Sequence, residues 1–239
     1  MAGAFTKKEA ELFFARLSSA LPEPSTELEY TNPYTLLVAV VLSAQATDKG
    51  VNAATARLFQ VANTPEKMLK LGEARLTEYI RTIGLYRNKA KNVIALSKAL
   101  LEHHAGQVPR EREALEALPG VGRKTANVVL NVAFGEGTIA VDTHVFRVAN
   151  RTQLAPGSTP LEVELGLERI VPDKYRLHAH HWLILHGRYV CVARKPRCPV
   201  CVVRDLCRFR PKTTAAELAG DAPPSRKPPS RAKAGPAGR

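Results

Sequence analysis

A short glycine-rich segment, residues 118–126, carries the clearest chemical signal in this sequence. Gly120 and Gly122 favour a tight turn, because glycine tolerates positive φ and leaves its N–H open to close approach. The amides of such a turn and of the following helix form an anion site that suits a DNA phosphate. Lys124 falls in the first turn of that helix, where the helix dipole and Arg123 favour the neutral, nucleophilic amine. A purely structural alternative is a glycine helix terminator followed by a solvated lysine.

A carboxylate stands directly before another predicted helix. Asp142 precedes residues 143–151, whose apolar positions have helical spacing. A side chain in that position can cap the helix by accepting hydrogen bonds from its first free amides. A carboxylate that faces Lys124 can also stabilise positive charge developing on a sugar and help to move protons. The sequence alone leaves both interpretations open, a structural cap and a catalytic carboxylate.

All cysteines of the chain lie close together near its C-terminal end, with the spacing C-x6-C-x2-C-x5-C. They are Cys191, Cys198, Cys201 and Cys207. Four thiolates this close in sequence can surround one zinc ion or a 4Fe-4S cube, and the spacing does not separate the two. Between the first two cysteines, Arg194, Lys195 and Arg197 place positive charge on the ligand loop, which suits phosphate binding.

These features together resemble the endonuclease III family of helix-hairpin-helix DNA glycosylases, over residues 6 to 210. The glycine hairpin, the Val-Asp-Thr-His segment at 141–144 and the cysteine spacing carry the resemblance. It implies that Lys124 is the catalytic nucleophile, that Asp142 is a catalytic aspartate and that the cysteines bind a 4Fe-4S cluster. It also implies that Gln45 and Leu85 fill and wedge the opened duplex. The structural alternatives are a helix-end hydrogen bond for Gln45 and ordinary core for Leu85.

The charge of the chain agrees with a nucleic-acid partner. There are 35 Lys and Arg residues against 22 Asp and Glu, a formal net charge of +13, which suits a polyanion but also fits a solubility feature. The predicted contacts to double-stranded DNA combine hairpin, wedge and basic residues. They are Gln45, Leu85, Gly120, Val121, Gly122, Arg123, Arg147, Arg194 and Lys195.

Helical apolar spacing with helical punctuation, and no strong alternating run, predicts an all-α protein. Thr6 and Glu9 form a capping box, and Thr64 and Thr159 each precede a proline at a helix start. Asp48 is the expected cap of a further helix. Other helices are expected over residues 34–42, 87–103, 111–117, 123–134, 143–151 and 178–189.

The family resemblance implies a two-domain helix-hairpin-helix glycosylase fold, with a helical barrel domain and an iron-sulfur cluster domain. The barrel domain would span residues 26–136, and the cluster domain would combine residues 1–25 with 137–211. From Lys212 the composition changes to Ala, Pro, Lys and Arg, which predicts a disordered basic tail over 212–239. A specific DNA-binding arm is the alternative for that tail.

The predicted function is a bifunctional DNA glycosylase and AP lyase that excises oxidised pyrimidines in base excision repair, as a monomer. One alternative is an adenine-type monofunctional glycosylase, which typically lacks a lysine at the place of Lys124 and has an additional C-terminal domain. A non-catalytic DNA-binding module is the other alternative.

No apolar run approaches the roughly 18 to 20 residues of a membrane span and no secretory signal is evident, so we expect a bacterial cytoplasmic, nucleoid-associated protein. The histidines near Trp182 (His178, His180, His181 and His186) are interpreted as mostly structural.

Overall fold

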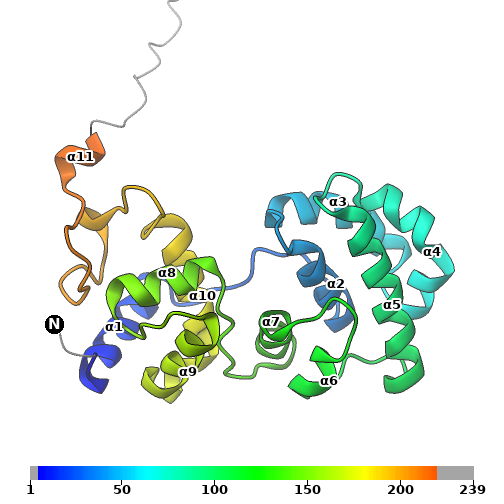
Figure 1. The fold of residues 1–239 in the computed structure, drawn as a ribbon, viewed down its shortest axis with the longest axis horizontal. Helices are drawn as coiled ribbons and strands as arrows, with labels where there is room; N and C mark the ends of the chain where they lie inside the picture. The colour runs from blue at the N-terminus through cyan, green and yellow to red at the C-terminus, as the bar shows by residue number, and fades with distance from the viewer. Residues whose placement is uncertain (1–4, 220–239) are drawn as a thin grey trace, which may run out of the picture.

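The computed structural model describes residues 5–219, and all regular secondary structure within this range is helical, as predicted. The helices form two lobes (Figure 1). The first lobe contains α2 (Pro33–Ser43), α3 (Asp48–Val61), α4 (Pro65–Ile80), α5 (Tyr86–His104), α6 (Arg112–Glu116) and α7 (Arg123–Phe134). The second contains α1 (Lys7–Ala20), α8 (Thr143–Thr152), α9 (Pro160–Ile170), α10 (Asp173–Tyr189), the 3-10 turn η1 (Cys198–Val200) and α11 (Ala215–Ala219).

Helix α2 is the centre of the first lobe. Its residues 34–42 are all buried, so the prediction of a buried helix here is confirmed. It packs against α3, α5 and α7, and the short α6 rests on α7. Burying each large aliphatic side chain contributes about 1.5–3 kcal/mol to the free energy of folding. The apolar run of α2 therefore stabilises the packing of α7, the helix that follows the glycine hairpin.

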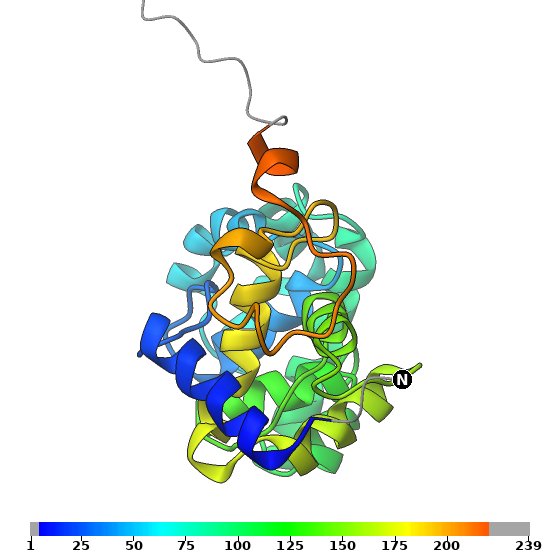
Figure 2. The same ribbon diagram turned by 90° about the vertical axis from the view of Figure 1, so that its left-hand side faces the viewer.

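The second lobe is assembled from the two ends of the chain. Figure 2 shows α1 lying against the α10 region, although the two helices are far apart in sequence. Phe13, Phe14 and Trp182 are buried in its core, and the Trp182 indole N–H donates to the Leu21 carbonyl at 2.8 Å. The predicted boundaries between the domains, at 25/26 and 136/137, remain a prediction.

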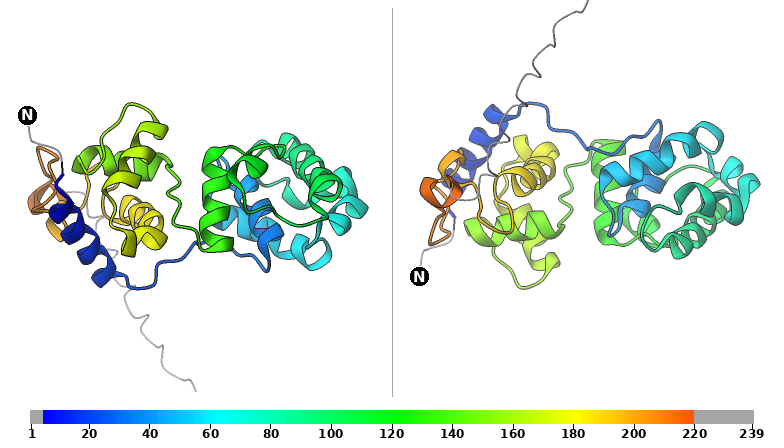
Figure 3. Two further views of the ribbon diagram at one scale, coloured as in Figure 1. Left: turned by 90° about the horizontal axis from the view of Figure 1, so that it is seen from below. Right: turned by 90° about the horizontal axis from the view of Figure 1, so that it is seen from above.

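Two connecting segments join the lobes. Residues 21–32 lead from α1 to α2, and residues 135–142 lead from α7 to α8 (Figure 3). Asp142 is the last residue of the second connection. Both connections therefore pass beside the boundary between the lobes, where one lobe contributes α7 and the other contributes α8 and α10. None of the described helices has the combination of length and apolarity that crossing a membrane requires.

The predicted helix starts are mostly confirmed. Thr6 forms the expected capping box with Glu9, and Thr64 and Thr159 cap helices that begin with proline. The prediction for Asp48 is wrong, because Thr47 is the cap and Asp48 lies in the first turn.

The structure also corrects two predicted boundaries. Helix α10 begins at Asp173, directly after Pro172, rather than at His178. The prediction placed the start too late because the polar first turn of this helix shows little apolar periodicity. In the tail, Ala215–Ala219 is helical because Thr214 and Glu217 form a capping box, so the prediction of disorder is wrong for that stretch. The rest of the predicted tail, residues 220–239, lies outside the described residues.

Candidate active site

The hairpin before α7 depends on one glycine for its turn. Gly120 has φ of +78°, and a Cβ there would come within 2.8 Å of the Asn92 side chain on α5. Gly122 has an extended backbone and open space beside it, so a phosphate can approach its amide closely. The side chain of Val121 is buried, and its amide closes the turn by donating to the Leu118 carbonyl at 3.1 Å. The predicted DNA contact of Val121 stays a prediction.

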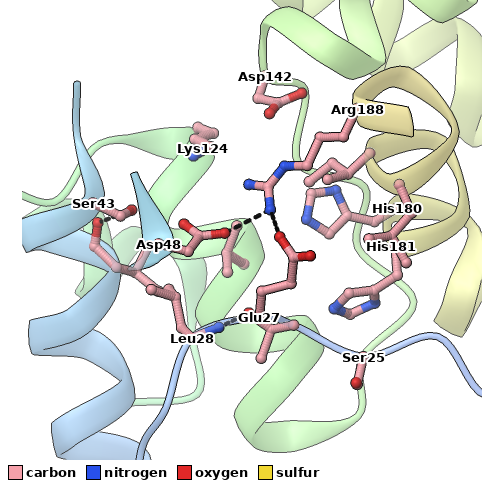
Figure 4. Close-up of a pocket in the computed structure, with 15 residues that line it drawn as sticks. Ser25, Glu27, Leu28, Ser43, Asp48, Lys124, Asp142, His180, His181 and Arg188 are labelled. Atoms are coloured by element: carbon pink, nitrogen blue, oxygen red, sulfur yellow. Dashed lines mark hydrogen bonds and ion pairs between the residues drawn. The ribbon is translucent and has the colours of Figure 1, made fainter. Parts of the chain in front are cut away.

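Lys124 and Asp142 come from different lobes and line the same cleft. Lys124 lies in the first turn of α7, and Asp142 is the cap of α8. One oxygen of Asp142, Oδ1, accepts from the amides of His144 and Val145, both at 2.8 Å. Within the described residues its Oδ2 has no hydrogen-bond partner. The capping interpretation is thus confirmed. The other oxygen, Oδ2, can still accept a hydrogen bond or a proton in the cleft (Figure 4).

An ion-pair network that the sequence prediction missed lies within this cleft. The Arg188 guanidinium on α10 contacts the carboxylate of Asp48 at 2.7 Å and also that of Glu27, which in turn accepts from the Tyr189 hydroxyl. Figure 4 shows Arg188 with its dashed contacts to Asp48 and Glu27, near Lys124. Hydrogen-bond donors and acceptors therefore lie together in this cleft. No local sequence signal joins Glu27, Asp48 and Arg188, which come from three separate elements.

Two buried histidines, His180 and His181, also line the cleft, and their interpretation as mostly structural stays a prediction. Burial, the neighbouring His181 and the positive charge of Lys124 lower the pKa of His180 to about 3. Burial and His178 lower the pKa of His181 to about 4. Both imidazoles are therefore neutral near pH 7. The Nδ1 atom of each is buried without a hydrogen-bond partner.

The Arg123 side chain is paired within the protein, and its predicted contact with DNA stays a prediction. Its guanidinium turns to the other lobe, where its Nε and NH2 donate to the Glu164 carboxylate on α9 at 2.8–3.2 Å. Its charge is therefore compensated by a carboxylate. The Arg123 amide remains at the start of α7, where the first N–H groups of a helix have no intrahelical acceptor.

Arg147 also has acceptors within the protein. Its guanidinium donates to the carbonyl oxygens of Cys191 at 3.0 Å and Gly187 at 2.8 Å, and it contacts His144 Nδ1 at 3.1 Å. The side chain thereby ties α8 to the end of α10 and to the first cysteine. Its predicted contact with DNA stays a prediction, since these donors have acceptors within the second lobe.

Gln45 and Leu85 lie at the tips of two neighbouring loops. Both have positive φ, 55° and 58°, and a Cβ placed on Gly84 would come within 3.9 Å of the Gln45 carbonyl. Leu85 is 59% exposed, so the alternative of an ordinary core position is wrong. The Gln45 side chain is also exposed and makes no hydrogen bond to a described residue. An exposed leucine in a strained backbone conformation suits insertion into a base stack better than packing in the protein.

The four cysteines surround one cavity, which is also lined by His186 and Phe209. His186 Nε2 lies 3.6 Å from the Cys201 sulfur, and Arg151 donates to the Cys191 sulfur at 3.8 Å. Four thiolates around one cavity can hold a metal centre, and the nearby donors suit negatively charged sulfur ligands. The loop between the first two cysteines carries Arg194 and Lys195, both exposed.

Comparison with known families agrees with this site. Residues 38–173 match the HhH-GPD superfamily of base excision DNA repair proteins, and residues 191–207 match the iron-sulfur binding domain of endonuclease III. The first match covers more than half of the chain and includes the hairpin, Lys124 and Asp142. The chain is therefore a helix-hairpin-helix protein of base excision DNA repair.

Sequence identity to individual proteins identifies the family within this superfamily. The chain is 60% identical to endonuclease III of Escherichia coli K12 over 197 residues, which cover 82% of this chain and 93% of that protein. It is 59% identical to endonuclease III of Treponema pallidum over 200 residues, 84% of this chain and 95% of the relative. It belongs to the endonuclease III family, which identifies its cofactor as a 4Fe-4S cluster.

Solved structures give the same result. A trapped covalent intermediate between endonuclease III and DNA superposes with a TM-score of 0.81 at 46% identity, covering 85% of this chain and 96% of that one. A thermostable thymine-DNA glycosylase superposes with a TM-score of 0.75 at 26% identity, covering 84% of this chain and 96% of that one. The two-lobed arrangement with an interlobe cleft is thus the fold of this glycosylase family.

Proposed function

We propose that the chain is a bifunctional DNA glycosylase and AP lyase that removes oxidised pyrimidines, with Lys124 as the covalent catalyst. The observation that carries this proposal is the position of Lys124: it starts a helix beside an open glycine turn and lines the same cleft as Asp142. The turn holds a backbone phosphate, and the cleft receives the nucleotide that has left the stack.

In the first half of the reaction the Lys124 amine attacks C1′ of the damaged nucleotide. The bond from C1′ to the base breaks, and the base leaves with the bonding electrons and takes up a proton. Opening of the sugar ring then gives an imine between C1′ and the lysine nitrogen. The Asp142 carboxylate stabilises the positive charge that develops on the sugar while its Oδ1 keeps α8 capped.

In the second half a proton is removed from C2′, next to the imine. The electron pair forms the C2′–C3′ double bond, and the 3′ phosphate leaves with the electrons of the C3′–O bond. Asp142 assists this proton transfer. Water finally hydrolyses the imine and restores the free amine of Lys124. This sequence uses lysine, carboxylate and water.

The rest of the machinery binds and opens the DNA. We assign backbone phosphate contacts to the hairpin amides of Gly120 and Gly122 and to the exposed Arg194 and Lys195. Gln45 fills the space left by the extruded nucleotide, and Leu85 wedges the opened stack. The network of Glu27, Asp48 and Arg188 offers donors and acceptors to the polar edge of a pyrimidine ring. Both catalytic side chains come from one chain, which supports action as a monomer, and we place it on the bacterial nucleoid.

Ligation of the cluster is assigned to Cys191, Cys198, Cys201 and Cys207. The cluster orders the loop that carries Arg194 and Lys195, and no step of the sugar chemistry passes through it. We expect purified protein to be brown and to contain iron and acid-labile sulfide in equal amounts, about four of each per chain. Colourless protein with one zinc per chain would contradict this assignment.

Borohydride trapping on abasic-site duplex DNA tests the nucleophile. Wild-type protein should give a covalent adduct, because borohydride reduces the imine to a stable amine. Lys124→Gln should give none while still binding the DNA, and Lys98→Gln, at an exposed position on α5, is the matched control. An adenine-type glycosylase or a non-catalytic DNA-binding module would give no such lysine-dependent adduct. Adduct formation by Lys124→Gln at the wild-type rate would assign the nucleophile to another amine.

A further inference from the structure

The ion pair between Arg123 and Glu164 joins the helix of the nucleophile to the lobe of the catalytic carboxylate. We infer that this pair is a positioning device: it holds Lys124 at the correct rotation and distance from Asp142, and neither of its side chains contacts the substrate. The inference rests on the proposed function, because it needs Lys124 to be the attacking amine.

The geometry of the pair is that of a rigid clamp. Arg123 Nε lies 3.0 and 3.2 Å from the two carboxylate oxygens of Glu164, and Arg123 NH2 lies 2.8 Å from Oε1. The planar guanidinium fork fixes direction as well as distance, which a single hydrogen bond does not. The two residues are 41 positions apart in sequence and come from α7 in the first lobe and α9 in the second.

Burial makes the pair difficult to exchange for other partners. The side chain of Glu164 is only 5% exposed, whereas that of Arg123 is 37% exposed. A carboxylate this deeply buried needs a bound cation, so Glu164 holds Arg123 in one orientation. Hydrogen bonding to Glu164 correspondingly raises the pKa of Arg123.

The ion pair acts on Lys124 through the residue directly before it in the chain. Arg123 and Lys124 are the first two residues of α7, so fixing one side chain to the second lobe sets the rotation of the helix start that carries the other. In the second lobe, Glu164 lies on α9, which packs against α8, and Asp142 is the N-cap of α8. The ion pair and the packing of α9 against α8 thus link Lys124 to Asp142.

Breaking the clamp should slow imine formation without weakening DNA binding. A misplacement of about 1 Å near the reacting atoms costs on the order of 100-fold in rate. For Glu164→Gln we expect single-turnover trapping with borohydride to slow by about tenfold to 100-fold. The affinity for abasic-site duplex should change by less than about twofold. The phosphate contacts of the hairpin and of the cluster loop, which is the loop between Cys191 and Cys198, remain in this variant.

Three variants complete the test. Arg123→Lys keeps the charge but removes the fork, so it should also slow trapping at unchanged affinity. The double variant Arg123→Lys/Glu164→Gln should be no slower than the slower single variant, since both changes break the same link. Glu168→Gln removes a nearby charge that influences Arg123 without one of these hydrogen bonds, and it should trap at the wild-type rate.

The outcomes separate this inference from the proposed function. Absence of a trapped adduct with wild-type protein would contradict the proposed function itself. A wild-type adduct together with wild-type trapping rates for Glu164→Gln and Arg123→Lys would overturn only the positioning role. A parallel loss of affinity and salt dependence in Arg123→Lys would overturn it too, by showing that Arg123 is a DNA contact. If Glu164→Gln does not fold, Arg123→Lys decides the question.

Discussion

The Arg147 guanidinium bonds the Cys191 carbonyl with an Nε to O distance of 3.0 Å, and this contact joins the helix that begins at Asp142 to the first cysteine of the cluster loop. A second bond, to the Gly187 carbonyl at 2.8 Å, ties the same side chain to α10. One arginine therefore joins three parts of the second lobe: helix α8 with its cap Asp142, helix α10 at the cleft, and the loop between Cys191 and Cys198.

Replacement of Arg147 by Gln should destabilise the protein with little direct effect on phosphate binding. Hydrogen bonds from a charged donor are worth about 1.5–3 kcal/mol each, so losing the two carbonyl contacts should cost about 3 kcal/mol or more of unfolding free energy. Urea unfolding measures this loss, and DNA binding is measured at several salt concentrations at a temperature where the variant is folded.

Arg194→Gln is the comparison for that experiment. Arg194 is exposed on the cluster loop, so its replacement should leave stability nearly unchanged and lower the slope of log affinity against log salt by about one. If Arg147→Gln lowers the salt slope to the same extent, Arg147 contacts a phosphate after all, and its protein contacts do not describe its role in the complex.

The two roles of Asp142 can be separated by side-chain chemistry. Asparagine caps a helix about as well as aspartate, so Asp142→Asn should change the unfolding free energy by less than about 0.5 kcal/mol. The same variant loses the carboxylate charge and should slow single-turnover base excision by about 10² to 10⁴-fold. Asp142→Ala loses both functions and should be about 1 kcal/mol less stable as well. Wild-type excision by Asp142→Asn would reduce Asp142 to a cap.

Local signals in the sequence predicted the elements well and long-range partners poorly. The capping boxes and the apolar spacing of α2 depend on residues within a few positions of one another, so the helices could be read directly. The hairpin, the cap before α8 and the cysteine segment are local in the same way. That Lys124 and Asp142 belong to one active site was expected only through the family resemblance, and both line one cleft.

The protein partners of arginines could not be predicted from the sequence. Arg123 and Arg147 are predicted DNA contacts because they are basic and lie near Lys124 and Asp142. Their acceptors, Glu164 and the Cys191 carbonyl, lie 41 and 44 positions further along the chain. Which arginine is paired depends on how the two lobes and the cluster loop pack, and neither composition nor periodicity contains that information.

Leu85 should matter for opening the duplex and not for the stability of the protein. Leu85→Gly removes an exposed side chain and relieves the positive φ, so the unfolding free energy should be unchanged or higher, by up to about 1 kcal/mol. Base excision from duplex DNA should slow by about tenfold or more, because the wedge offsets part of the few kcal/mol needed to extrude a nucleotide.

A second substrate and a control variant isolate that effect. The same lesion in single-stranded DNA needs no duplex opening, so excision from it should be reduced much less by Leu85→Gly. Leu161→Ala, at an exposed leucine on α9, should leave both rates unchanged. An equal loss on the duplex and the single strand would show that Leu85 acts on chemistry or general binding, and the wedge assignment would fail.

The buried histidines of the cleft should make folding sensitive to mild acid. The pKa values of His180 and His181 are lowered to about 3 and about 4, whereas an unfolded histidine has a pKa of about 6.5. Below about pH 6.5 the unfolded chain therefore takes up protons that the folded protein excludes, and stability falls as the pH falls. Each histidine contributes a slope of about 1.4 kcal/mol per pH unit, down to its own folded pKa.

Urea unfolding at intervals between pH 7 and pH 5 measures this slope above the range in which carboxylates titrate. His181→Gln should reduce the slope by about 1.4 kcal/mol per pH unit in the lower part of that range, because one excluded proton is removed. The same substitution at exposed His103 is the matched control. If wild-type stability is flat from pH 6.5 to pH 5, the two imidazoles are reachable by protons in the folded state, and the cleft is more hydrated than their burial indicates.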